Sequence, residues 1–147
     1  MTDIKILYGS ETGTSEGLAN NAGTELKNAG FNTEVLDMSN VVVKDLKEYK
    51  KLLIITSTWG DGTPPSNAEE LHDELETSSI DLSNLNYAIF AIGDTGFEKF
   101  CQTGIDFDNY LENLGSKRVL PLEKAEYDYE TKFLTWLDKV KEKFSSF

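Results

Sequence analysis

The chain has 147 residues, of which 39% are hydrophobic, so it is long and apolar enough to bury a core and is not a disordered segment. Its 26 acidic residues outnumber the 14 basic ones and give a net charge of −12, which disfavours nucleic acids and anionic membranes as partners. No apolar run approaches the roughly 20 residues of a membrane-spanning helix, and the N-terminal sequence MTDIKI is unlike a signal peptide. The single cysteine, Cys101, has no partner for an internal disulfide. We therefore expect one domain over residues 1–147, located in the cytoplasm.

Five short apolar runs predict the strands of a sheet, and four stretches with helical spacing of apolar residues alternate with them. The predicted strands are residues 4–9 (IKILYG), 31–38 (FNTEVLDM), 51–59 (KLLIITSTW), 86–93 (NYAIFAIG) and 117–122 (KRVLPL). The run 51–59 is nearly continuous, which is typical of a strand covered on both faces. Pro121 indicates an edge position for the last strand.

Each predicted helix has apolar spacing or a residue that marks its beginning or end. Gly30 ends the first helix and Gly115 the third, at the position of a C-terminal cap, and Ser66 with Glu69 forms a capping box that begins the second. The apolar positions are Leu18, Ala19, Ala22, Leu26 and Ala29 in the first helix, Phe107, Leu111 and Leu114 in the third, and Phe133, Leu134, Leu137, Val140 and Phe144 in the last. No repeat or linker-like segment interrupts this order, which agrees with a single domain.

Strands that alternate with helices in a domain of this size predict an α/β fold, a doubly wound five-stranded parallel sheet with helices on both faces. The strand order that fits is 2-1-3-4-5. Ligands of such sheets bind beyond the carboxyl ends of the strands, near the switch between strands one and three. The loops after strands one, three and four should therefore carry the function.

The loop after the first strand, GSETGTSE, is rich in hydroxyl groups and leads into a helix. The expected ligand contacts are Ser10, Glu11, Thr12, Gly13, Thr14 and Ser15. The free N–H groups and the positive dipole end of a helix N-terminus favour an anion. The loop holds no lysine or arginine, so it lacks the P-loop pattern and suits a monophosphate that stays bound and is not transferred. A helix cap with surplus hydroxyl groups is the alternative.

The loops after the third and fourth strands, STWGDGTPPSN and GDTGFEKFC, each place an aromatic side chain beside glycines. Trp59 in one loop and Phe97 in the other are suited to covering the two faces of a flat ring. The expected contacts are Ser57, Thr58, Trp59, Gly60, Asp61 and Gly62 in the first of these loops and Gly93, Asp94, Thr95, Phe97, Phe100 and Cys101 in the second. The alternative is that the aromatic side chains belong to the core, which applies more to Phe100 than to Phe97.

On these residues the whole chain resembles a short-chain flavodoxin. Residues 10–15 (SETGTS) resemble the phosphate loop of that family, with Ser15 in place of its last threonine. Residues 57–60 (STWG) and 93–101 (GDTGFEKFC) resemble the segments that cover the two faces of the flavin ring. The resemblance implies a flavodoxin-like fold and non-covalently bound FMN, because no motif for the second phosphate of FAD is present. It implies no metal ligands and no catalytic residues.

Two features depart from the usual family pattern. Phe97 stands where tyrosine is usual, which keeps the stacking but removes a hydroxyl group. Residues 61–71 (DGTPPSNAEEL) are closer to the flavodoxin-like domains of two-flavin reductases than to many free flavodoxins. The sequence after Leu122 leaves no room for the extra loop that interrupts the last strand of long-chain flavodoxins.

The resemblance implies a low-potential one-electron carrier that alternates between the semiquinone and hydroquinone of FMN and turns over no substrate of its own. Its partners would be a flavodoxin or ferredoxin reductase and acceptor enzymes. The acidic balance favours partners with basic docking patches and also serves solubility, and we expect a monomer. His72, the only histidine, is expected to be solvated on a charged helix and to have no role, and Cys101 is expected to be buried near the ring and not a nucleophile.

Two other functions stay open. The nearer one is a dedicated flavodoxin-like module, an accessory protein or reductase partner that serves one enzyme. The other is a binding or signalling domain on the same fold that uses the first loop for a phosphorylated ligand. The phosphate-accepting aspartates of receiver domains would stand at the ends of strands one and three, where this sequence has Gly9 and Ser57 or Thr58, and this argues against the signalling class.

Overall fold

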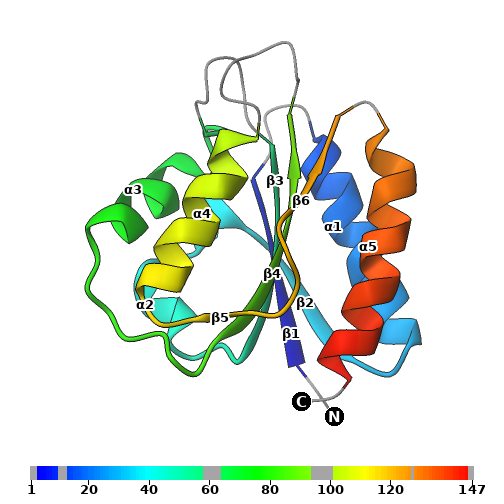
Figure 1. Ribbon diagram of the computed structural model, residues 1–147, viewed down its shortest axis with the longest axis horizontal. Coiled ribbons are helices and arrows are strands. Elements are labelled where there is room, and N and C mark those ends of the chain that lie inside the picture. The colour runs from blue at the N-terminus through cyan, green and yellow to red at the C-terminus, as the bar shows by residue number, and fades with distance from the viewer. Residues whose placement is uncertain (1–2, 10–12, 58–63, 94–100, 127, 146–147) are drawn as a thin grey trace.

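The computed structural model describes residues 3–9, 13–57, 64–93, 101–126 and 128–145, which form a twisted parallel sheet between two layers of helices (Figure 1). The strands are β1 (Asp3–Gly9), β2 (Asn32–Asp37), β3 (Lys51–Ser57), β4 (Asn86–Ile92), β5 (Lys117–Arg118) and β6 (Glu123–Ala125). Their order is β2-β1-β3-β4-β5, and β6 also pairs with β4. The predicted α/β class and the order 2-1-3-4-5 are confirmed.

The fifth position of the sheet is occupied by two short strands instead of one. β5 pairs with the beginning of β4 and β6 with its end, both in parallel. Pro121 lies between them and has no N–H group to donate to a ladder, which is one reason why the pairing is interrupted. The prediction of one continuous strand over residues 117–122 is therefore wrong, although its place at the sheet edge is correct.

Helices cover both faces of the sheet (Figure 1). α1 (Thr14–Asn28) and α5 (Tyr129–Phe144) lie on one face, and α2 (Val43–Leu46), α3 (Glu69–Thr77) and α4 (Gln102–Asn113) lie on the other, with a short 3₁₀ helix η1 (Met38–Asn40) after β2. Gly30 and Gly115 follow the ends of α1 and α4 with φ of 100° and 95°, as their predicted capping role requires. The second predicted helix begins at Glu69 and not directly after Ser66, because residues 66–68 form a turn first.

Two clusters of apolar side chains form the core, one on each face of the sheet. Lys51 to Thr56 of β3 are buried, as the continuous apolar run predicted. The buried Lys51 donates from Nζ to the backbone oxygen of Phe144 at 2.9 Å and so satisfies a carbonyl in the last turn of α5. Leu134, which was expected in the apolar stripe of α5, is 56% exposed.

Trp136 of α5 is buried in the apolar cluster between the sheet and the helices α1 and α5. It is 1% exposed, and its ring lies 5.5 Å from that of Phe90 and 5.7 Å from that of Phe133. Its Nε1 has no hydrogen-bond acceptor among the residues that the structure describes. The indole is thus held by packing alone.

His72 lies between α3 and α4 and not on the surface, so the expectation that it is solvated is wrong. Only 8% of the residue is exposed. Its ring meets the rings of Phe107 and Tyr110 edge-on, with centroids 5.7 and 5.3 Å apart. The surrounding sequence EELHDEL indicated a charged face, yet Leu71 precedes His72 and Leu75 follows it by three residues, which places the histidine at the margin of the buried stripe.

Gly104 and Gly17 provide a matched test of helix packing. An ideal Cβ on Gly104 would lie 2.5 Å from the Cβ of Ala91, whereas one on Gly17 would have nothing within 4 Å. Gly104→Ala should lower the free energy of unfolding by about 1–3 kcal/mol, because α4 packs too closely on β4 to admit a methyl group. Gly17→Ala should raise it by about 0.5–1 kcal/mol. Urea unfolding measures both, and a Gly104→Ala variant as stable as the parent would contradict the close approach.

Candidate functional site

The carboxyl ends of β1, β3 and β4 meet at one edge of the sheet, at the top of Figure 1. Gly9 pairs with Thr56, and Ser57 pairs with Ile92, so the three strands end at nearly the same level. The hydroxyl groups of Thr56 and Ser57 both donate to the backbone oxygen of Gly9, at 3.4 and 3.5 Å. The three predicted loops therefore start side by side.

Most of the predicted contact residues lie outside the described part of the chain. These are Ser10, Glu11 and Thr12, then Thr58, Trp59, Gly60, Asp61 and Gly62, and finally Asp94, Thr95, Phe97 and Phe100. Their contacts with a ring or a phosphate stay predictions. Gly13, Thr14, Ser15, Ser57, Gly93 and Cys101 are described, and all of them lie at or next to the carboxyl edge.

The beginning of α1 has the backbone geometry of an anion site. Gly13 caps the helix with a φ of 87°, a left-handed conformation that residues with a Cβ avoid, and its backbone oxygen accepts from the N–H of Gly17 at 3.0 Å. Thr14 and the buried Ser15 then form the first turn of the helix. This arrangement supplies neutral donors and a positive dipole end without a cationic side chain.

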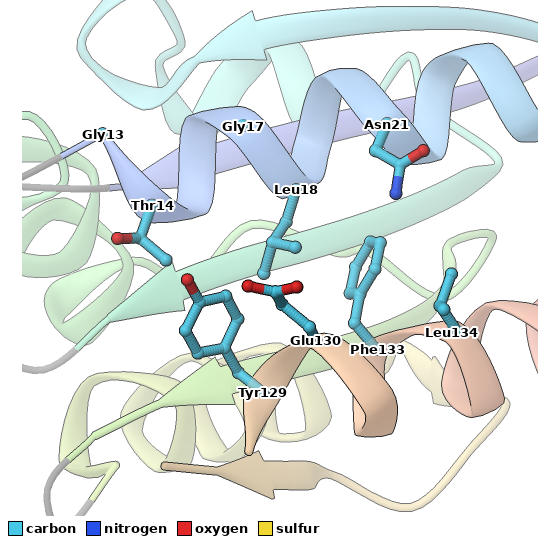
Figure 2. A pocket seen from close by; sticks show the side chains of 9 residues that line it. All are labelled: Gly13, Thr14, Gly17, Leu18, Asn21, Tyr129, Glu130, Phe133 and Leu134. Carbon is cyan, nitrogen blue, oxygen red and sulfur yellow. The ribbon is translucent and has the colours of Figure 1, made fainter. Parts of the chain in front are cut away.

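A shallow groove runs from this point between α1 and α5. Figure 2 shows Gly13 and Thr14 at one end of it, near Tyr129, with Leu18 and Phe133 pointing into the space between the helices. Gly17 has no side chain to fill the groove. Because the groove follows the helices and not the strand ends, we assign it no contact with the ring.

The end of β4 is tied to the fifth position of the sheet. The N–H of Gly93 donates to the backbone oxygen of Ala125 at 2.9 Å. Cys101, directly before α4, is fully buried with a φ of 56°, and its thiol lies 3.5 Å from the backbone oxygen of Ala91. Burial raises the pKa of this thiol to about 11, so it is protonated at neutral pH. The predicted burial of Cys101 is confirmed.

The sequence analysis missed two polar links beside this edge. Asn67 donates from Nδ2 to Oδ1 of Asp37 at 3.2 Å and so joins the end of β2 to the segment before α3. Tyr8 donates to Oε2 of Glu16 at 3.2 Å, which holds that carboxylate beside the end of β1. Asp37 is the last residue of β2, and its place near the end of the predicted strand was the one signal that could have drawn attention to it.

The described residues fit a flavin mononucleotide. The helix N-terminus offers neutral donors for one phosphate, and the two strands that precede the predicted aromatic loops end at nearly the same level of the sheet. Among the described residues no group of three or more His, Cys, Asp or Glu side chains could hold a metal ion, and none of the described helices is both long and apolar enough to cross a bilayer.

Comparison with known proteins decides the family. The flavodoxin family model matches residues 6–145. This chain belongs to the flavodoxin family. It is therefore an FMN-binding electron-transfer domain, and the resemblance found in the sequence is confirmed.

Individual relatives are of two kinds. The sulfite reductase [NADPH] flavoprotein alpha-component of Bacillus subtilis is 42% identical over 139 residues, which are 94% of this chain but 23% of that protein. Flavodoxin 2 from Bacillus cereus is 29% identical with a TM-score of 0.84 and covers 97% of this chain and 99% of its own. A flavodoxin from Streptococcus pneumonia TIGR4, 24% identical, has a TM-score of 0.86 and covers 99% of both chains, which supports the fold. The chain thus spans about a quarter of the length of the curated relatives that it matches.

Gly13 tests the proposed phosphate site. Gly13→Ala should lower the free energy of unfolding by about 1–2 kcal/mol, because a Cβ is unfavourable at this φ. It should also weaken FMN binding about tenfold, as the first N–H groups of α1 are displaced. Gly13→Asn should lose less of both, since asparagine tolerates the left-handed region. Urea unfolding and quenching of flavin fluorescence measure the two effects, and equal FMN affinity in all three proteins would contradict the assignment.

Cys101 should resist thiol reagents in the folded protein. A disulfide reagent added at about pH 8 should react slowly, because the thiol is both buried and protonated there. In concentrated urea the same reagent should react with one thiol per chain. Rapid reaction of the folded protein would show that the segment before α4 opens readily.

Proposed function

We propose that this chain is an FMN-dependent electron-transfer module dedicated to one enzyme, of the kind found in the flavoprotein component of NADPH-dependent sulfite reductase. The observation that carries the proposal is the 42% identity with that component over 94% of this chain, against 29% with a flavodoxin of the same length. The segment DGTPPSNAEEL points the same way, because it is closer to two-flavin reductases than to many free flavodoxins.

The chain's own residues bind and orient the cofactor, and FMN supplies the redox chemistry. Gly13, Thr14 and Ser15 would hold the phosphate at the beginning of α1. Trp59 and Phe97 would cover the two faces of the ring and exclude water from them. The Ser57 hydroxyl, which already contacts the Gly9 carbonyl, would lie at the base of the ring between them.

Acidic side chains would govern both the potential and the docking. The sequence has no lysine or arginine between Leu52 and Glu98, and α3 alone carries five carboxylates. One negative charge about 10 Å from the ring makes the addition of an electron less favourable by about 0.8 kcal/mol at an effective dielectric constant of about 40. The carboxylates of α3 would also attract a partner with a basic patch and would accelerate its association with this protein at low salt.

A second candidate is a free-standing carrier that serves several acceptors. It is favoured by the similarity to Flavodoxin 2 from Bacillus cereus, with 29% identity and a TM-score of 0.84. The two candidates bind the same cofactor and differ only in the range of their acceptors.

A survey of electron acceptors separates the two candidates. The purified protein should be yellow and release FMN, identified by its mass. Reduced protein should transfer electrons to the sulfite reductase of its host at least about tenfold faster than to unrelated flavodoxin acceptors, because dedicated docking raises the association rate. Similar rates with several unrelated acceptors would favour the free carrier. A folded protein that stays colourless with added FMN would overturn both.

A further inference from the structure

We propose that His72 is a positioning residue for the cofactor site: its imidazolium form joins α3 to the first turn of α4, and its loss of a proton weakens FMN binding. The inference rests on the proposed function only in that FMN binds at the carboxyl edge, and it does not depend on the identity of the acceptor.

The geometry around the ring fits a doubly protonated histidine. Nε2 lies 2.7 Å from Oδ2 of Asp106, and Nδ1 lies 3.0 Å from Oδ1 of Asp73. An ionised carboxylate only accepts hydrogen bonds, and a neutral imidazole carries one N–H. Only the imidazolium, with an N–H on each nitrogen, can donate to both carboxylates at once.

The same contacts link the histidine to the beginning of α4. Gln102, the first residue of α4, donates from Nε2 to the other oxygen of Asp106 at 2.7 Å. Asp106 is thus held between the first turn of α4 and His72 on α3. These two helices follow residues 58–63 and 94–100, the segments expected to cover the two faces of the ring. The contact between His72 and Asp106 thus fixes α3 relative to α4.

The charged surroundings favour the protonated form. Burial alone would lower the pKa of His72, but the hydrogen bonds and negative charges of Asp106 and Asp73 outweigh it and raise the pKa above its usual value. Among the described residues, the titratable groups around the ring are Asp73 of α3 and Asp106 and Tyr110 of α4, with Glu76 of α3 bonded to the Tyr110 hydroxyl. η1 and α2 also pack on α3, and the N–H of Val43 in α2 donates to Oε1 of Glu74 at 2.6 Å.

The direction of the pH effect follows from linkage. A group whose pKa is raised in the folded state stabilises that state below its unfolded pKa of about 6.5, and the contribution is lost as pH rises through the folded pKa. Because the imidazolium form favours the arrangement of α3 and α4 that binds FMN, bound FMN should in turn raise the pKa of His72 further. The affinity for FMN should therefore fall as His72 loses its proton. The size of this fall equals the ratio of the acid constant of His72 in the FMN-free protein to that in the FMN-loaded protein.

The test uses the fact that His72 is the only histidine in the chain. Its ring signal in NMR can be titrated without ambiguity in the FMN-free and FMN-loaded protein, and the acid constant should be about threefold lower when FMN is bound. The dissociation constant for FMN, measured by flavin fluorescence, should rise about threefold between about pH 6 and pH 9, in agreement with the change in the acid constant of His72. His72→Gln, which retains a donor for Asp106 without a charge, should lack this rise. The ionisation of the FMN phosphate affects both proteins equally and cancels in the comparison.

Two further variants guard against misinterpretation. Asp106→Asn keeps the shape of the side chain but removes its charge, which should lower the pKa of His72. The rise of about threefold in the dissociation constant for FMN should then occur at lower pH, which a purely structural role would not produce. Glu70→Gln changes the charge of α3 by the same one unit on its exposed face and should leave the pH step in place.

The outcomes separate this proposal from the proposed function. A parent protein that binds FMN with the same pH profile as His72→Gln would overturn the role of His72 alone. An acid constant of His72 that is equal with and without FMN would also overturn the role of His72. This measurement uses the parent protein alone and does not depend on the folding of a variant. A parent protein that binds no FMN would overturn both.

Discussion

The register of β1, β3 and β4 is the constraint on which the rest of the structure depends. Alternate residues of β3 enter opposite cores, Leu53 and Ile55 on the α1–α5 side and Leu52 and Ile54 on the α3–α4 side. A slip of one residue would exchange every one of these side chains between two differently shaped interiors. Packing of the core thus decides where each strand stops, and the level at which β1, β3 and β4 end determines where the predicted cofactor loops can begin.

Features encoded by local sequence were predictable. Continuous apolar runs marked the buried strands, since a strand covered on both faces has no polar side to show. Gly30 and Gly115 marked helix ends because a left-handed residue is needed directly after each helix. The composition of the three loops indicated a singly phosphorylated flat ring, the resemblance to short-chain flavodoxins implied FMN, and the family match supports it. In each case the signal lies within a few residues of the feature that it predicts.

Features that depend on distant segments were not predictable. The burial of His72 requires α4 to lie against α3, and nothing within EELHDEL indicates which neighbour will cover it. Lys51 is buried because α5, more than ninety residues later in the chain, ends beside it. The fifth position of the sheet divides because Pro121 interrupts a ladder whose other side is β4. For the site itself the sequence indicated which residues to expect, whereas the common level of the strand ends appears only in three dimensions.

The sealed environment of Trp136 has a spectroscopic consequence. An indole surrounded by hydrocarbon emits at shorter wavelengths than one in water, and the Nε1 of Trp136 has no hydrogen-bond acceptor among the described residues. The other tryptophan, Trp59, belongs to a loop expected to face the flavin. A Trp59→Phe variant would therefore leave Trp136 as the only tryptophan, and its emission would report on the interior alone.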